Sequence, residues 1–90
     1  MDKEFSVGDI VISLSGHDKN RPFIIVSIDK NDYCGIIDGR CRTKNKPKFK
    51  NPKHLKIVAH SEEILAKVMS KLSTDTEIYK LIKVYKEVKE

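Results

Sequence analysis

The feature that most constrains this chain is a change of hydrophobic period at Ser61. Before it, short apolar runs are separated by clusters of Gly, Asp and Asn, a pattern typical of strands and turns. After it, apolar residues recur every three or four positions, as on one face of a helix. The sequence therefore predicts a mainly β domain over residues 1–60 and a helical extension over 61–90, which packs on that domain or on a partner.

Several segments of the first part predict strands. They are Asp9–Ser15, Phe23–Ile28, Tyr33–Ile37 and a short last strand, Leu55–Val58. The unbroken apolar run of Phe23–Ile28 indicates a strand that is buried on both faces. Asp38-Gly39 is a strong signal for a two-residue hairpin, which would make Arg40–Thr43 the returning strand. Residues 44–53 contain two prolines and five lysines, so we expect an open, extended connection there and no central strand.

The last thirty residues predict two short helices, over 62–72 and 75–88. Ser61 is a good N-cap, and acidic residues in the first turn suit the helix dipole. Thr74 and Glu77 have the spacing of a capping box at the start of the second helix.

Length and composition exclude several classes of protein. Ninety residues suffice for one small core and not for a cofactor-binding domain plus a substrate domain. No apolar run approaches the roughly 20 residues that span a bilayer, and Met1–Glu4 lacks the features of a signal peptide. Two cysteines are too few for a disulfide scaffold. We therefore expect a cytoplasmic protein that does not engage membranes.

The net charge of +5 is unevenly distributed along the chain. Residues 1–38 carry four basic and seven acidic side chains, residues 39–60 carry eight basic and none acidic, and residues 61–90 carry six of each. A solvated surface normally mixes both signs, whereas a block of one sign favours contact with a polyanion.

The basic block also has a period of two. Beyond the expected hairpin, basic residues occupy every second position: Arg40, Arg42, Lys44, Lys46, Lys48 and Lys50. An extended chain would place them on one side, about 6.6 Å apart, close to the separation of neighbouring phosphates on a nucleic-acid strand. The alternative is that lysines protect an exposed edge from aggregation. The interpretation as a phosphate-binding row requires these cations to be displayed together and not neutralised by carboxylates.

Other residues could extend such an interface. Lys19 and Arg21 lie in the first long loop, and Lys53 and His54 follow the basic block. Phe49 lies within it, either as a ring for base stacking or as an anchor that packs the loop onto the core. Phosphate contacts position a nucleic acid without reading its sequence.

Three segments in order resemble a known motif. Gly8-Asp9-Ile10-Val11, the loop from Gly16 to Asn20, and Phe23-Ile24-Ile25-Val26 resemble a KOW motif. The continuation through Asp38-Gly39-Arg40, Lys46-Pro47-Lys48 and Lys53-His54-Leu55 is similar to small bacterial KOW-containing RNA-binding proteins, which resemble a large-subunit ribosomal protein of archaea and eukaryotes. The resemblance covers about residues 5–58.

This resemblance implies an SH3-like β-barrel over residues 1–60, with a basic loop at 40–56, followed by two helices. It implies binding to RNA, ribosomal RNA above all, with a role in translation or ribosome assembly and with ribosomal proteins as further partners. It places the loop from Gly16 to Arg21 near RNA. His17 stands where the family pattern often has arginine, which leaves Lys19 and Arg21 as that loop's cationic contacts.

Metal binding and catalysis have weaker support. Cys34, Cys41, His54 and His60 are the residue types of a zinc site, but six residues separate the cysteines, where a zinc knuckle needs two to four. We expect instead that both cysteines are small buried side chains beside Ile36. No nucleophile–base motif and no phosphate-cradling glycine loop is present. The sequence thus predicts a non-enzymatic protein, without metal or cofactor, that is monomeric when free.

Two other functions remain open from the sequence. A protein–protein module of the transcription or translation machinery would show an apolar surface patch and weak salt dependence. A non-specific DNA-binding protein would use the same cations.

Overall fold

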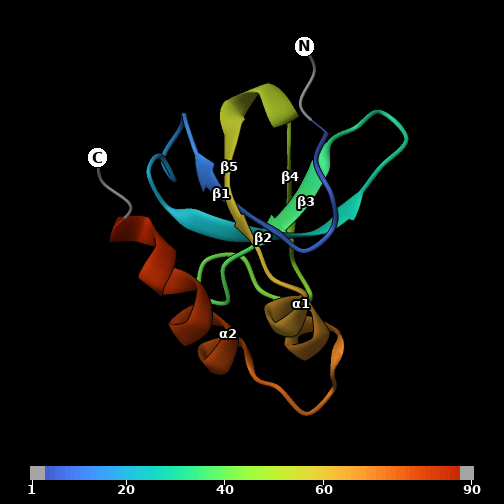
Figure 1. Cartoon of the computed structure of the whole chain (residues 1–90), viewed down its shortest axis with the longest axis vertical. Coiled ribbons are helices and arrows are strands. Elements are labelled where there is room, and N and C mark those ends of the chain that lie inside the picture. The colour runs from blue at the N-terminus through green and yellow to red at the C-terminus, as the bar shows by residue number, and fades with distance from the viewer. Residues whose placement is uncertain (1–3, 88–90) are drawn as a thin grey trace.

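Residues 4–87 of the chain are described by a computed structural model, which contains one antiparallel sheet of five strands followed by two helices (Figure 1). The strands are β1 (Asp9–Ser13), β2 (Pro22–Ile28), β3 (Cys34–Ile37), β4 (Lys48–Lys50) and β5 (Leu55–His60). The helices are α1 (Glu62–Met69) and α2 (Asp75–Ile82), and short 3-10 turns follow β4 and α2 as η1 (Pro52–His54) and η2 (Lys83–Glu87). The prediction of a mainly β fold with two C-terminal helices is confirmed.

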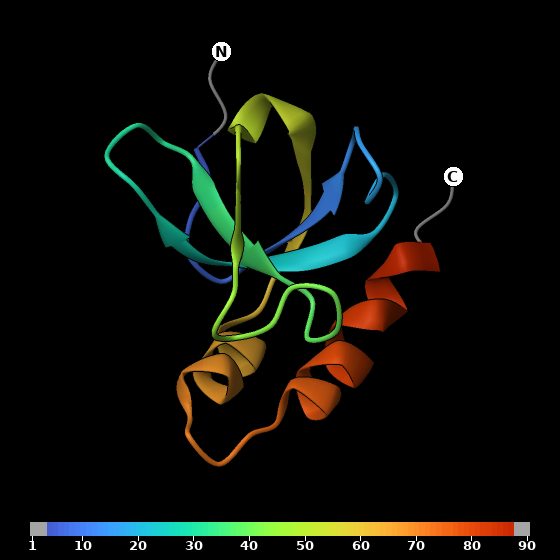
Figure 2. The same ribbon diagram turned by 180° about the vertical axis from the view of Figure 1, so that it is seen from behind.

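The strands lie in the order β4-β3-β2-β1-β5. The sheet is strongly curled, and both helices lie on the same side of it (Figures 1 and 2). Its two edge strands, β4 and β5, follow one another in the chain through η1, but no ladder of hydrogen bonds joins them within the described residues. The curled sheet is therefore not closed by its backbone.

Curling gives the sheet two apolar cores. The helix-facing core contains Ile10, Ile24, Ile37, Ile64, Val68, Ile78 and Ile82. The inner core, on the concave face, contains Val11, Phe23, Ile25, Cys34, Ile36 and Leu55. Successive residues of a strand point to opposite faces, so β2 contributes Ile24 to one core and its neighbours to the other. The prediction that this strand is buried on both faces is confirmed for its first half.

The helices begin where their caps predict. The Ser61 hydroxyl accepts a hydrogen bond from the Ile64 N–H at 3.0 Å, and Thr74 and Glu77 form the reciprocal capping box. Helix α1 ends at Met69, earlier than expected, and Leu72 is left 92% exposed. Helix α2 ends at Ile82 and continues as η2; the expected end at residue 88 lies outside the described residues.

The predicted hairpin at Asp38-Gly39 is wrong. Strand β3 pairs with β4 and not with residues 40–43, which form a loop. The Asp38 carboxylate accepts hydrogen bonds from the backbone N–H groups of Arg40 and Arg42, each at 2.9 Å. The N–H groups of Asp38 and Gly39 in turn donate to the Arg42 carbonyl. These bonds close residues 38–42 into a compact turn. An Asp side chain that binds nearby backbone N–H groups offers them an alternative to the hydrogen bonds of a strand ladder.

Strand β4 lies where an open connection was expected, and that expectation is wrong for residues 48–50. Pro47 precedes the strand and Pro52 follows it. Because proline cannot donate to a ladder, such a strand suits a sheet edge, and β4 is an edge strand. The prediction that no central strand occurs here is confirmed.

A histidine joins the sheet to the first helix. The Nδ1 atom of His60 lies 2.7 Å from a carboxylate oxygen of Asp9, and its Nε2 atom lies 2.7 Å from one of Glu62. The hydrogen bonds with Glu62 and Asp9 raise the pKa of His60 above its ordinary value of 6.5. The contact thereby connects β1, β5 and α1.

Within residues 4–87, no helix has both the length and the apolar character that crossing a bilayer requires.

Gly39 should be among the least replaceable residues of the sheet–helix junction. Its φ is +83°, and an added Cβ would lie 2.4 Å from the Asp75 carbonyl oxygen and 2.6 Å from the Tyr79 nitrogen. We expect Gly39→Ala to lower the free energy of unfolding in urea by about 2–4 kcal/mol. Gly16→Ala is the matched control, since its φ is +86° but its nearest neighbour lies at 3.5 Å, so only the backbone strain of about 1–2 kcal/mol applies. Equal losses would contradict the packing argument.

The His60 contact should make stability depend on pH near neutrality. A raised pKa in the folded state means that the stabilisation is fully present below the unfolded value of 6.5 and is lost as pH rises through the folded value. We expect the free energy of unfolding to fall over this range in the wild type and to change much less in His60→Gln. His17→Gln, at an exposed loop histidine, should keep the wild-type dependence. If the free energy of unfolding of His60→Gln depended on pH as steeply as that of the wild type, the dependence could not be attributed to His60.

Candidate nucleic-acid interface

The predicted row of six cations is not formed. Only Lys48 and Lys50 share a side of a strand, and the register pairs them with Ile36 and Cys34. Both of these partners belong to the inner core, so the two lysines point towards the concave face of the sheet. The remaining four members lie in the loop of residues 38–47, outside any strand.

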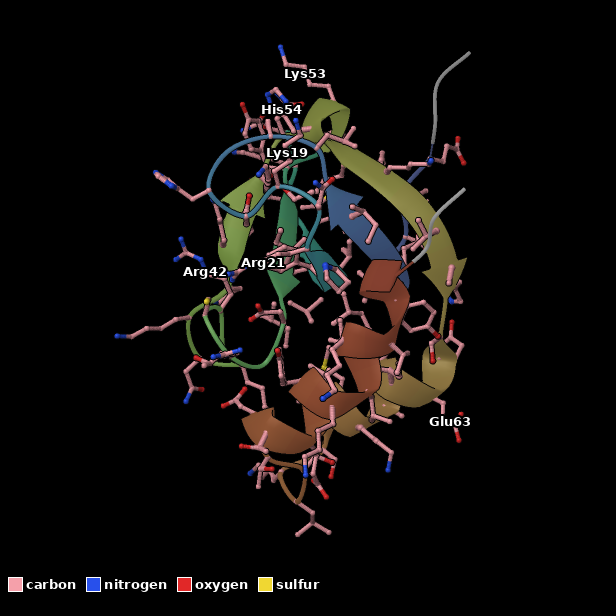
Figure 3. All side chains as sticks on the ribbon, turned by 90° about the vertical axis from the view of Figure 1, so that its left-hand side faces the viewer. Lys19, Arg21, Arg42, Lys53, His54 and Glu63 are labelled. Carbon is pink, nitrogen blue, oxygen red and sulfur yellow. The ribbon has the colours of Figure 1, made fainter. Side chains whose placement is uncertain are left out.

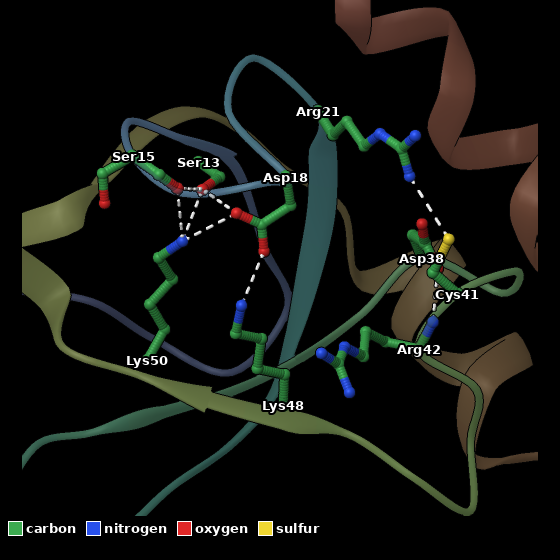
Figure 4. Close-up of polar contacts among 9 residues, drawn as sticks. All are labelled: Ser13, Ser15, Asp18, Arg21, Asp38, Cys41, Arg42, Lys48 and Lys50. Carbon is green, nitrogen blue, oxygen red and sulfur yellow. Dashed lines mark hydrogen bonds and ion pairs between the residues drawn. The ribbon is translucent and has the colours of Figure 1, made fainter.

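Lys50 is buried, with a side chain only 8% exposed. Its ammonium donates to the Ser13 hydroxyl at 2.7 Å, to the Ser15 carbonyl at 2.8 Å and to the Asp18 carboxylate at 2.8 Å (Figure 4). An ammonium has three protons, and all are used here. The prediction that Lys50 contacts a ligand is not supported by this geometry, because its charge and donors are already satisfied.

Asp18 holds a second lysine in the same cluster. The Lys48 ammonium lies 3.1 Å from its other carboxylate oxygen. Partial burial acts to raise the pKa of Asp18, but hydrogen bonds from Lys50, Ser13 and Lys48 outweigh it and hold the pKa well below the ordinary range. Asp18 is therefore ionised at neutral pH and neutralises part of the basic block. We call Ser13, Asp18, Lys48 and Lys50 the closing cluster, because it joins edge strand β4 to the end of β1 and the loop that follows.

Lys44 also has an internal role. Its ammonium donates to the carbonyl oxygens of Ser70 at 2.7 Å and Ser73 at 3.0 Å. Its backbone N–H donates to the Asp75 carboxylate at 2.9 Å. Lys44 thus fixes the 38–47 loop against the connection between the two helices, where it binds the carbonyl of Ser70, the C-cap of α1, and that of Ser73, which precedes the N-cap of α2.

Arg40 is exposed but oriented by a helix. Its guanidinium lies 5.4 Å from the centroid of the Tyr79 ring and donates to the Tyr79 hydroxyl at 3.1 Å. This cation–π contact holds the side chain without cancelling its charge.

The other predicted cations are exposed and make no ion pair within the described residues. They come from the β1–β2 loop, the 38–47 loop and η1, and His54 beside them is half-buried. Figure 3 shows the side chains of Lys19, Lys53 and His54 at one end of the molecule, with Arg21 and Arg42 on the same side nearer the helices. We call the exposed cations of these three segments, together with His54, the three-segment surface; they are Lys19, Arg21, Arg42, Lys46, Lys53 and His54.

Two contacts hold these segments next to one another. The Leu14 N–H donates to the His54 carbonyl at 2.8 Å, which fixes the start of the β1–β2 loop against η1. The Arg21 guanidinium donates to the Cys41 sulfur at 3.2 Å, which joins the other end of that loop to the 38–47 loop. Three separate parts of the sequence therefore form one side of the molecule.

Phe49 points to the face of β4 opposite Lys48 and Lys50, as strand alternation requires. Its ring lies over Gly35, where an added Cβ would come within 3.2 Å of two ring atoms. The side chain nevertheless remains 51% exposed. The ring packs on the sheet at Gly35, which agrees with the anchor reading, while base stacking by its exposed part stays a prediction.

The two cysteines are not together. Cys34 is buried in the inner core, whereas Cys41 is exposed in the 38–47 loop. The expectation that both are buried beside Ile36 is wrong for Cys41, because it depended on the hairpin that does not form. Desolvation raises the pKa of the Cys34 thiol. Among residues 4–87, no group of three or more His, Cys, Asp or Glu side chains is placed to hold a metal ion.

Sequence reasoning missed the two residues that organise these charges. In the sequence, Asp18 lies in a loop rich in turn formers, and no pattern singles out Tyr79. A usable signal for Asp18 exists, since it is the acidic residue of a loop that also holds Lys19 and Arg21. Tyr79 gives no comparable signal, because its contact with Arg40 spans 39 residues.

In comparison with known proteins, no protein-family model matches the chain, and no curated protein matches it either.

The closing cluster should dominate the acid stability of the fold. Asp18→Asn leaves a buried ammonium without its counter-ion, which we expect to lower the free energy of unfolding by about 3–5 kcal/mol. The depressed pKa of Asp18 makes its stabilisation present above the unfolded value of 3.8 and lost as pH falls below it. The stability of Asp18→Asn should therefore fall less than that of the wild type below about pH 4.

Asp32→Asn is the matched control, since Asp32 is exposed in a turn. The double variant Asp18→Asn/Lys50→Met should recover part of the loss, because it removes the unpaired charge as well. Urea unfolding between pH 3 and 7 measures all four proteins. Equal stability of the two Asp→Asn variants would contradict the role given to Asp18.

Proposed function

We propose that this protein binds RNA through phosphate contacts made by the three-segment surface. The observation that carries the proposal is that Lys19, Arg21, Arg42, Lys46 and Lys53 are exposed and unpaired with any described carboxylate. The acidic residues closest to them in sequence are otherwise engaged. Asp18 is held by two lysines, and Asp38 by backbone N–H groups.

The mechanism is release of counter-ions from the nucleic-acid backbone. Each phosphate that a protein cation neutralises frees condensed salt ions, so affinity falls steeply as salt rises. Cations on three segments that hydrogen bonds join can follow a folded backbone more closely than a straight row would. Such contacts favour recognition by shape, which is typical of RNA-binding proteins.

The topology supports the same proposal. A five-stranded antiparallel sheet in the order β4-β3-β2-β1-β5, with a 3-10 turn between the last two strands, supports the SH3-like barrel that we propose. The closing cluster would complete such a barrel through side chains. The resemblance of residues 5–58 to KOW-containing RNA-binding proteins assigns RNA contact to the β1–β2 loop, which carries Lys19 and Arg21. On that resemblance, ribosomal RNA is the proposed target and the cytoplasm the proposed location.

One observation favours a second candidate function. Apolar side chains are exposed on and after the helices: Met69 by 59%, Leu72 by 92% and Val84 by 64%. A protein–protein module of the transcription or translation machinery would use such residues and would show little salt dependence. SH3-like folds serve both functions, so the fold does not choose between them.

The test compares two triple variants that remove the same charge. Lys19→Gln/Arg42→Gln/Lys53→Gln alters the three-segment surface, whereas Lys67→Gln/Lys71→Gln/Lys80→Gln alters exposed lysines in the helical part. Binding of a structured hairpin RNA and of a duplex DNA of equal length is measured as a function of salt. The first variant should lose about three units from the slope of log affinity against log salt, and the second should retain the wild-type slope.

Equal losses in the two variants would mean that net charge alone determines binding, which would contradict the proposed surface. Tighter binding of the duplex DNA than of the RNA would favour the DNA alternative. A wild type that binds neither probe, yet retains a partner from nuclease-treated lysate, would favour the protein–protein candidate.

A further inference from the structure

A small pocket lies between the sheet and the second helix, beside the three-segment surface. Three cationic residues line it, each from a different part of the chain: Arg21 before β2, Arg40 in the 38–47 loop, and Lys83 at the start of η2. Its apolar wall includes Ile82, which is 1% exposed. Residues this far apart in sequence meet only because the loop and α2 pack together.

One aromatic ring orients two of the cations. The Arg40 guanidinium lies 5.4 Å from the centroid of the Tyr79 ring, and the Lys83 ammonium lies 5.8 Å from it. Arg40 also donates to the Tyr79 hydroxyl at 3.1 Å. A tyrosine ring attracts cations through its negative face, so Tyr79 orients both cations at the pocket, and neither of them forms an ion pair with a described side chain.

The pocket has an excess of positive charge. Its acidic residue is Asp38, one of whose oxygens already accepts two backbone hydrogen bonds at 2.9 Å. None of Arg21, Arg40 and Lys83 forms an ion pair with any side chain that the structure describes. The arrangement therefore suits an anion that carries more than one negative charge.

The volume limits which anion fits. The pocket has a volume of about 120 Å³. Pockets for drug-sized ligands are several times larger, from about 300 Å³. A single tetrahedral oxyanion suits a pocket of this volume better than a complete nucleotide does.

We infer that this pocket binds a phosphate group, held by the guanidinium groups of Arg21 and Arg40 and by the ammonium of Lys83. Guanidinium groups suit this role because their parallel N–H groups match two phosphate oxygens at once. The phosphate could belong to an RNA terminus, to the RNA backbone or to a free ion. The inference extends the proposed RNA-binding surface but is testable without RNA, so the two proposals can fail separately.

The first experiment titrates the full chain with inorganic phosphate at constant ionic strength and follows backbone amide resonances by NMR. We expect saturable shifts at Gly39, Arg40, Tyr79 and Lys83, and at least a tenfold weaker affinity in Arg40→Gln/Lys83→Gln. The matched control Lys67→Gln/Lys71→Gln should retain the wild-type affinity. Because Arg40 also packs on Tyr79, the single variant Lys83→Gln is measured too and should weaken binding with unchanged urea stability.

The second experiment identifies the source of the phosphate. It compares 5′-phosphorylated and 5′-hydroxyl oligoribonucleotides of one sequence, each with the wild type and with Arg40→Gln/Lys83→Gln. Weakening of only the phosphorylated RNA indicates a terminal phosphate, equal weakening of both indicates a backbone phosphate, and no weakening of either indicates a free ion. In the first experiment, amide shifts that do not saturate with inorganic phosphate would overturn the inference. Phosphate binding that is equally strong in Lys83→Gln would overturn it too.

Discussion

The Lys50 ammonium determines how this fold is completed. Strand β4 has three residues between two prolines, and no backbone ladder joins it to the opposite edge of the sheet. Lys50 joins β4 to the end of β1 and the loop that follows, because its ammonium binds Ser13, Ser15 and Asp18. Such a buried charge is tolerable only because all its protons are satisfied. No buried side-chain nitrogen or oxygen among the described residues lacks a partner.

The same cluster sets the position of the candidate interface. Asp18 lies in the β1–β2 loop, so the lysines that hold it also fix the loop that carries Lys19 and Arg21. The basic block thus divides into two kinds of residue. Lys44, Lys48 and Lys50 stabilise the fold, while Arg42, Lys46 and Lys53 remain exposed to solvent. Removing the first kind would reduce binding only by damaging the structure that supports the second.

Local patterns predicted the secondary structure better than they predicted the charges. The apolar runs located most strands, and Ser61 and Thr74 located both helix starts, because those signals depend on neighbouring residues alone. The hairpin prediction failed because the Asp38 carboxylate accepts hydrogen bonds from the N–H groups of Arg40 and Arg42, which therefore do not pair in a strand ladder. Whether a lysine is exposed or buried depends on a partner far along the chain: Asp18 is 32 residues from Lys50. Periodicity carries no information about such pairs. The sequence therefore located the block of basic residues correctly but predicted wrongly that its cations would form one row.

The most direct measurement of this account is lysine reactivity, determined by amine labelling and mass spectrometry of the full chain with and without a structured RNA. The account predicts that Lys50 and Lys44 react slowly in both states, that Lys19, Lys46 and Lys53 become protected when RNA is added, and that Lys67 and Lys71 do not change. Protection of Lys67 and Lys71, with Lys19 and Lys53 still reactive, would place the RNA on the helical side and contradict the account.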